Sequence, residues 1–189
     1  MKVVIVDYNA GNIRSLCYAL EKIGVDWILS SDALEIEQAD RVIIPGVGAA
    51  GAALQQLRSK SLDLLIPQLK QPVLGICLGM QLLCAHSEED DTACLGIIPQ
   101  SVLKFKPAAG LKVPHMGWNQ VHKNVEPDKR WMYFVHSYYV PVNEFTTLQC
   151  NHGTPFSAMV QKDNFTGMQF HPEKSAREGM ALLEQFLKS

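Results

Sequence analysis

Short apolar segments alternate with amphipathic segments along the first half of the chain, and this alternation constrains the fold more than any other feature. Apolar runs of the length of a buried strand lie at 3–6, 25–29, 41–44 and 72–76. Apolar side chains at helical spacing lie at 13–23, 49–60 and 78–86, and Gly24 follows the first of these segments. Strand–helix–strand order predicts parallel strands joined by crossover helices, so we expect an α/β fold whose sheet is covered on both faces.

The second half of the chain has a different pattern. Prolines and glycines are frequent from residue 97 to about 160, which favours short antiparallel strands or hairpins there, and 120–132 resembles a polar loop. A last strand is expected at 166–170. A last helix is expected from Ser175, since Glu178 three residues later gives the spacing of a capping box. The predicted fold is therefore a mostly parallel central sheet flanked by helices, with antiparallel additions.

Composition excludes several classes of protein. A chain of 189 residues with 47% hydrophobic and 19% charged residues is expected to form one folded domain over 1–189. Its formal net charge of −2 argues against a nucleic-acid arm or a polybasic membrane surface. We expect no transmembrane helix and no signal peptide. Five scattered cysteines without a CxxC pair favour reduced thiols and a cytoplasmic location, and no histidine spacing predicts a metal site.

The strongest chemical signal is Gly75-Ile76-Cys77-Leu78-Gly79, between a predicted strand and a predicted helix. This is the arrangement of a nucleophile elbow with cysteine in place of serine. A helix N-terminus favours the thiolate and offers N–H groups to an oxyanion. The alternative is a buried structural cysteine in a glycine-rich turn.

A cysteine nucleophile needs a base, and the base needs an orienting group. His171-Pro172-Glu173 supplies both, because Pro172 favours an extended His171 and residues two apart in an extended chain point to the same side. A second glycine-rich turn, Gly46-Val47-Gly48, follows the 41–44 strand and is expected at the same sheet edge, where its N–H groups would face an oxyanion. A solvated histidine, a surface glutamate and a simple turn are the alternatives.

These segments resemble a known family. The stretch from Gly75 to Gln81, with His171-Pro172-Glu173, is similar to the class I (triad) glutamine amidotransferases, and the resemblance covers almost the whole chain. Segments 45–48, 114–119, 7–12 and 134–138 resemble the glutaminase subunits of imidazole glycerol phosphate synthases, which belong to histidine biosynthesis. The resemblance implies a flavodoxin-like sheet and hydrolysis of glutamine to glutamate and ammonia through a glutamyl thioester.

The resemblance also implies roles for individual residues. The catalytic triad would be Cys77, His171 and Glu173. The oxyanion would be bound at Val47, Gly48 and Leu78. Glutamine would be bound by Gly46, Gln81, Glu89, Ser137 and Tyr138, although the acidic run around Glu89 also fits a solvated loop. The partner interface would include Asn12, Met116, Trp118, Asn119 and Lys174, although Trp118 also fits a core aromatic.

No cofactor and no metal is expected for this hydrolysis. The implied partner is a (β/α)8-barrel cyclase subunit that uses the ammonia to make imidazole glycerol phosphate and an aminoimidazole carboxamide ribonucleotide. Val47 is β-branched between two glycines and resists a positive φ. We therefore expect that the oxyanion turn rests with an N–H facing away and that the partner shifts its conformation.

Three other functions fit parts of the pattern. Another class I amidotransferase, such as the glutaminase of vitamin B6 or guanylate synthesis, shares the triad. A cysteine hydrolase acting on peptides or glycated substrates uses a similar elbow. A non-catalytic scaffold could keep the fold, although the intact Cys77, His171 and Glu173 argue against it.

Overall fold

The computed structural model describes residues 1–11, 13–107, 111–123 and 130–189. The helices are α1 (Arg14–Ile23), α2 (Ala33–Glu37), α3 (Ala50–Ser59), α4 (Leu62–Leu65), α5 (Leu78–Leu82) and α6 (Ala176–Lys188), with 3₁₀ turns η1 (Ile66–Gln68), η2 (Glu89–Asp91) and η3 (Pro172–Lys174). The strands are β1 (Lys2–Val6), β2 (Asp26–Ser30), β3 (Arg41–Ile44), β4 (Val73–Ile76), β5 (Cys84–Ser87), β6 (Thr92–Ala93), β7 (Ile98–Lys104), β8 (His115–His122), β9 (Arg130–His136), β10 (Tyr138–Tyr139), β11 (Thr146–Asn151), β12 (Pro155–Lys162) and β13 (Phe165–Met168).

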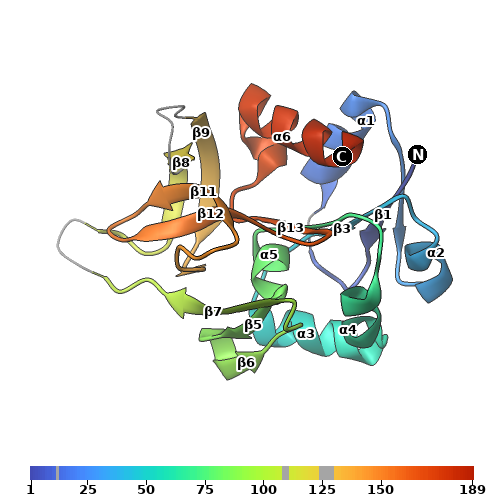
Figure 1. Ribbon diagram of the computed structural model, residues 1–189, viewed down its shortest axis with the longest axis horizontal. Helices are drawn as coiled ribbons and strands as arrows, with labels where there is room; N and C mark the ends of the chain where they lie inside the picture. The colour runs from blue at the N-terminus through green and yellow to red at the C-terminus, as the bar shows by residue number, and fades with distance from the viewer. Residues whose placement is uncertain (12, 108–110, 124–129) are drawn as a thin grey trace.

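The described strands form a large central sheet in the order β2-β1-β3-β4-β13-β12-β11-β8-β9. The pairs from β2 to β13 are parallel, and those from β13 to β9 are antiparallel. The predicted parallel first half and antiparallel second half are therefore confirmed. A smaller sheet, in the order β10-β7-β5-β6, lies below the central sheet in Figure 1.

Helices cover both faces of the parallel part of the sheet (Figure 1). Val3 and Ile5 of β1 pack in a cluster with side chains of α1 and α6, whereas Val4 and Val6 pack in a second cluster with side chains of α3. Successive side chains of a strand point to opposite faces, so the apolar run at 3–6 in β1 is that of a strand buried on both sides.

Two expectations about the elements between these layers are wrong. The helix predicted over 78–86 ends at Leu82, because Cys84 and His86 pair with β7 as part of strand β5. The loop predicted at 120–132 is partly strand, because 120–122 belong to β8 and 130–132 to β9, which pair with each other. In both places distant strand pairing overrides the local pattern.

The predicted capping box at Ser175 is also wrong. Ser175 precedes α6, but its side chain makes no cap hydrogen bond to that helix. Its hydroxyl instead donates to the carbonyl of His171 at 2.6 Å and accepts from the N–H of Tyr133 at 2.9 Å. The hydroxyl therefore bonds to Tyr133 on β9 and to His171, and it does not cap α6 as the sequence spacing suggested.

Candidate functional site

The predicted nucleophile elbow lies at the carboxyl ends of the parallel strands. Cys77 joins β4 to α5 with φ +53° and ψ −110°, and its N–H donates to the carbonyl of Met168 on β13 at 2.7 Å. The turn after β3 lies beside it, because β3 and β4 pair in parallel with Ile44 opposite Gly75. Both glycine-rich segments therefore reach the same sheet edge, as predicted.

Glycines allow the two segments to approach this closely. A Cβ atom added to Gly79 would lie 2.1 Å from the carbonyl oxygen of Ile44, and one added to Gly46 would lie 2.3 Å from the backbone nitrogen of Gly79. Any side chain at either position would overlap backbone. The two glycines thus bring the start of α5 against the turn that follows β3.

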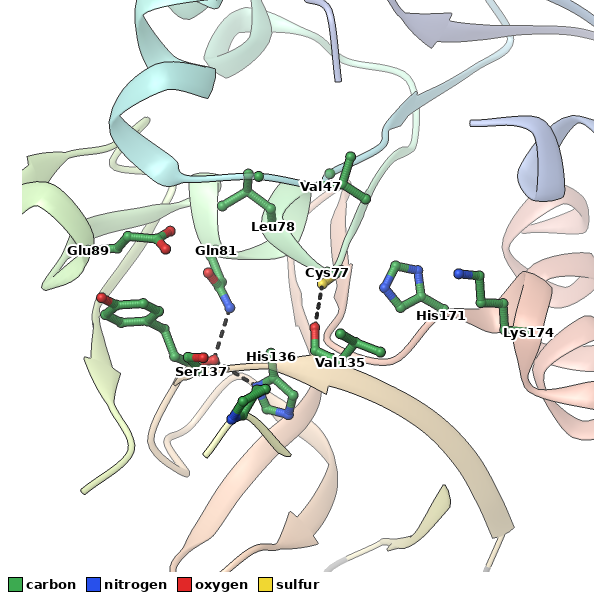
Figure 2. Close-up of a pocket in the computed structure, with 14 residues that line it drawn as sticks. Val47, Cys77, Leu78, Gln81, Glu89, Val135, His136, Ser137, His171 and Lys174 are labelled. Atoms are coloured by element: carbon green, nitrogen blue, oxygen red, sulfur yellow. Dashed lines mark hydrogen bonds between the residues drawn. The ribbon is translucent and has the colours of Figure 1, made fainter. Parts of the chain in front are cut away.

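A pocket of about 370 Å³ opens at this edge. Figure 2 shows Cys77 between His171 on one side and Gln81 and Glu89 on the other. The sulfur of Cys77 lies 3.7 Å from the carbonyl oxygen of Val135, which belongs to β9. Residues far apart in the sequence thus line one cavity: Gly46, Val47, Gly48, Cys77, Leu78, Gln81, Glu89, Pro114, Val135, His136, Ser137, Tyr138, His171 and Lys174.

His171 and Glu173 are joined as predicted. The Nδ1 atom of His171 lies 2.9 Å from Oε1 of Glu173, and both side chains are less than a tenth exposed. His171 is extended, with φ −91° and ψ 100°, but Glu173 belongs to the turn η3 rather than to an extended chain. The carboxylate therefore contacts the imidazole from a 3₁₀ turn, whereas we expected both residues to lie in an extended chain.

The environment of His171 favours its protonated form. Burial by itself lowers the pKa of the imidazole, but hydrogen bonds to Cys77 and Glu173 and the negative charges of both groups outweigh it and raise the pKa to about 10. A protonated imidazole next to the cysteine stabilises a thiolate. The three groups can therefore form a thiolate–imidazolium–carboxylate array.

A buried glutamine pair forms the wall behind the cysteine. Gln81 of α5 donates through Nε2 to the carbonyl of Tyr138 and to Oε1 of Gln169, each at 3.0 Å. Gln169 is fully buried, and its Nε2 lies 3.8 Å from the sulfur of Cys77. The sequence analysis did not single out Gln169, although an amide between two apolar residues in a strand pattern was an available signal.

Glu89 lies in the pocket rather than in a solvated loop. Its Oε2 accepts a hydrogen bond of 2.8 Å from the N–H of Ala50, the first residue of α3. Burial raises the pKa of this carboxyl group, and the hydrogen bond from Ala50 opposes the shift. The carboxylate thus contacts the first residue of α3 and also lines the cavity.

The turn that follows β3 carries its positive φ on glycine. Gly48 has φ +103°, and Val47 lies outside the left-handed region with its side chain exposed. Tyr8 donates a hydrogen bond to the carbonyl of Pro45, directly before the turn. The turn is therefore anchored at its start, while Val47 and Gly48 remain at the surface of the pocket.

The residues expected at a partner interface differ in exposure. The side chains of Met116 and Trp118 are exposed on β8, and Lys174 is exposed at the rim of the pocket. Asn119 is half-buried, and its amide nitrogen contacts Nε2 of His115 at 3.1 Å and the carbonyl of Asn151 at 2.9 Å. Asn119 therefore holds neighbouring strands together, and Asn12 lies outside the described residues.

No group of three or more potential metal ligands occurs among the residues that the structure describes. No helix in the same part of the chain is long and apolar enough to cross a membrane.

Comparison with known proteins identifies the class to which this fold and site belong. The family model of class I glutamine amidotransferases matches residues 4–189. The chain therefore belongs to the class I glutamine amidotransferases. Two solved structures share the fold: a glutamine amidotransferase with a TM-score of 0.78 and 16% identity, covering 98% of this chain and 97% of that one, and PurLQS from Thermotoga maritima with a TM-score of 0.70 and 16% identity, covering 99% and 97%.

Curated relatives define the family within that class. The imidazole glycerol phosphate synthase subunit HisH of Bacteroides thetaiotaomicron is 49% identical over 99% of both chains. The HisH subunits of Bacteroides fragilis and Idiomarina loihiensis are 48% and 45% identical, covering all of this chain and 100% and 98% of theirs. Within the class, the chain thus belongs to the HisH family.

Proposed function

We propose that this chain is the glutaminase subunit of an imidazole glycerol phosphate synthase in histidine biosynthesis. The observation that carries the proposal is that Cys77 and His171 line one pocket and contact each other, while Glu173 bonds to Nδ1 of His171, in a chain of the HisH family. The similarity to HisH over the whole chain favours this function over the glutaminases of vitamin B6 or guanylate synthesis and over an unrelated cysteine hydrolase.

The proposed reaction has two steps. The thiolate of Cys77 attacks the side-chain amide carbon of glutamine, and a C–S bond forms as the C–N bond breaks. His171 gives its proton to the departing nitrogen, which leaves as ammonia. His171 then takes a proton from water, whose oxygen attacks the glutamyl thioester; the C–S bond breaks, glutamate is released and Cys77 returns as the thiolate. Glu173 keeps Nδ1 of His171 protonated, so that Nε2 is the atom that exchanges the proton.

The pocket has groups suited to both ends of the substrate. Glu89 offers a carboxylate to the α-amino group of glutamine, and Ser137 and Tyr138 offer polar groups to its α-carboxylate. Gly46 and Gln81 line the space between. The N–H of Leu78, at the first position of α5, is the proposed first oxyanion donor, and the turn at Val47 and Gly48 is the proposed second.

A cyclase subunit is the proposed recipient of the ammonia. Met116, Trp118 and Trp131 are exposed, and the pairing of β8 with β9 places them on one face of the sheet together with Val135, which lines the pocket. Exposed aromatic and methionine side chains are typical of interfaces. We infer that the (β/α)8-barrel cyclase covers this strip and the nearby Lys174, and makes imidazole glycerol phosphate and an aminoimidazole carboxamide ribonucleotide.

The oxyanion turn is the proposed point of control. Val47 keeps a φ outside the left-handed region, and the adjoining Gly48 takes the positive φ instead. We propose that the partner and its nucleotide tip a peptide N–H of this turn into the site, and loss of one such donor typically costs about 10²–10³ in rate. A free subunit that hydrolyses glutamine as fast as the full complex would contradict the gate but not the glutaminase.

Two further features support the proposals of a single domain and of a cytoplasmic location. The two buried clusters pack on opposite faces of the same sheet, which supports one domain over 1–189. All five cysteines are free thiols, which is typical of a reducing compartment and supports a cytoplasmic location.

The first prediction tests the nucleophile. Cys77→Ala should reduce glutamate release in the complex with cyclase and nucleotide by at least about 10⁴-fold, because the covalent route is lost. Cys94→Ala, at a half-buried thiol directly after β6, should retain the rate. Glutamate release is measured by a coupled assay, and mass spectrometry of rapidly quenched enzyme should detect the glutamyl adduct. Equal rates for Cys77→Ala and the parent protein would refute the proposed chemistry.

The second prediction tests the partner surface. Trp118→Ala should weaken cyclase binding about tenfold, because truncation of a central interface aromatic commonly costs more than about 1 kcal/mol. Leu64→Ala, an exposed apolar side chain on α4, should leave the Kd unchanged. Calorimetric titration of the chain with cyclase measures both values, and identical Kd values for the two variants would contradict the proposed interface.

A further inference from the structure

Two buried histidines link the proposed substrate site to strand β8. His136, the last residue of β9, lines the pocket, and its Nδ1 lies 2.7 Å from the carbonyl oxygen of Tyr138. Its Nε2 lies 2.9 Å from Nδ1 of His115, and Nε2 of His115 lies 3.1 Å from the amide nitrogen of Asn119. Figure 2 shows His136 directly below the pocket, next to Ser137 and Val135.

These contacts form a row from Asn119 through His115 and His136 to the carbonyl of Tyr138, and their chemistry fixes which ring nitrogens carry a hydrogen. The carbonyl of Tyr138 only accepts, so Nδ1 of His136 carries a hydrogen. In a neutral ring Nε2 of His136 is then an acceptor, and Nδ1 of His115 must donate to it. Nε2 of His115 is left as an acceptor for the amide of Asn119, which has two hydrogens and gives the other to the carbonyl of Asn151. Each donor thus meets an acceptor only if both rings are neutral Nδ1–H tautomers.

The surroundings of the two rings favour this neutral state. Burial, together with the neighbouring His152, lowers the pKa of His115 to about 4. Burial lowers the pKa of His136 to about 3, despite its hydrogen bond to Tyr138. Phe105, Phe134 and Phe156 pack around the pair at centroid distances of 4.8–6.4 Å. His152 stacks on His115 at 4.1 Å but bonds to the carbonyl of Lys112, so it lies outside the row.

The row ends on a carbonyl that the proposed substrate approaches. The oxygen of Tyr138 accepts from His136 and also from Nε2 of Gln81 at 3.0 Å, so both of its lone pairs are used. A carbonyl with two donors presents little free negative charge to a carboxylate bound beside it. The orientation of this peptide group is also fixed, because rotating the carbonyl away would break both hydrogen bonds.

We propose that His115 and His136 are positioning residues of the glutaminase site: as a neutral pair in which each hydrogen bond is donated in the direction from Asn119 to Tyr138, they hold the Ser137–Tyr138 segment in place for the α-carboxylate of glutamine. The inference rests on the proposed function of the pocket. Neither histidine touches the reacting amide, so the pair acts on substrate binding and not on the chemical step.

The first test measures the tautomers and needs no activity. Two-bond ¹⁵N–¹H correlation spectra of the full chain with ¹⁵N-labelled histidine distinguish Nδ1–H from Nε2–H rings, and His115→Phe and His136→Asn assign the two signals. Both rings should be neutral Nδ1–H tautomers at pH 7. An Nε2–H or protonated His136 in the parent chain would overturn the proposal.

The second test uses the two amide side chains that mimic opposite ring nitrogens. His136→Asn places an N–H near the position of Nδ1 and retains the donor to Tyr138, whereas His136→Gln reaches toward Nε2 and loses it. In the complex with cyclase and nucleotide, His136→Gln should raise the KM for glutamine about tenfold with kcat changed less than about threefold, and His136→Asn should restore most of the KM.

The matched control is His152→Phe, which retains a ring stacked near His115 but leaves the row intact, and should keep the parent KM. An unchanged KM in His136→Gln, or an equal rise in His136→Asn and His136→Gln, would refute the positioning role. If even the parent complex releases no glutamate, the proposed function fails, whereas the tautomer measurement still decides the proton order.

Discussion

The backbone of Cys77 has a strained conformation that places its side chain at the pocket. A cysteine at φ +53° and ψ −110° is outside the regions that L residues prefer, and such strain costs about 1–3 kcal/mol. The hydrogen bond from its N–H to Met168 and the close backbone contacts of Gly79 hold the conformation. The thiol is thereby placed at the pocket and directly before α5.

A third prediction concerns the glycine behind this turn. Gly79→Ala should lower the free energy of unfolding by about 2–3 kcal/mol, because its Cβ would lie 2.1 Å from the carbonyl oxygen of Ile44. Gly51→Ala on α3 is the control, since its Cβ would meet only the side chains of Asp90 and Thr92, at 3.1 Å or more. Urea unfolding measures both variants. A Gly79→Ala protein as stable as Gly51→Ala would show that the elbow tolerates a wider separation.

At the scale of elements, hydrogen bonds join the segment around η3 to β9. The N–H of His171 donates to the carbonyl of Tyr133 at 3.0 Å, and the hydroxyl of Ser175 bonds to both residues. Two of these hydrogen bonds hold the segment that carries His171 and Glu173 against β9, whose carboxyl end lines the pocket, and the third joins Ser175 to His171 within the segment. The position of the imidazole depends on this junction and not on α6 alone.

A fourth prediction tests this junction. Ser175→Ala should destabilise the protein by about 1–3 kcal/mol, because it leaves the N–H of Tyr133 and the carbonyl of His171 without their buried partner. It should also lower kcat/KM for glutamine, since His171 loses a constraint. Ser59→Ala, which removes an exposed hydroxyl on α3, should be neutral. Equal melting curves for the two variants would contradict the role of Ser175.

At the scale of the whole molecule, the central sheet separates two clusters of buried apolar side chains, and the His115–His136 pair lies within one aromatic part of this interior. The antiparallel half of the sheet thus contributes more than an extension of the parallel half. It supplies Val135 and His136 of β9 to a pocket whose nucleophile comes from the parallel half.

A fifth prediction follows from the two neutral histidines. Their pKa values of about 4 and 3 lie below the ordinary value of 6.5, so between about pH 6.5 and 4 the unfolded chain binds protons that the folded chain does not. Stability should therefore rise with pH across this interval, by up to about 1.4 kcal/mol per pH unit for the fully buried His136. Urea unfolding at several pH values measures the slope. His136→Asn should flatten it, and an unchanged slope would mean that other groups dominate.

The sequence alone predicted the proposed chemistry and the alternation of strands and helices in the first half of the chain. Apolar periodicity placed β1, β3, β4 and α1 almost at their observed bounds, because local propensity and burial act in the same direction there. The GxCxG and His-Pro-Glu segments predicted that Cys77, His171 and Glu173 act together, since each residue type serves a step of nucleophilic catalysis.

Tertiary structure decided what each polar group contacts. The helical periodicity of 78–86 continues past Leu82, yet Cys84 is part of a strand because it pairs with β7. The hydroxyl of Ser175 bonds to Tyr133 and does not cap α6. Gln169, His115 and His136 have no local signature that reveals their partners, because those partners lie on other strands. A hydrogen bond between residues distant in the chain depends on strand order and register, and these are fixed only when the whole sheet assembles.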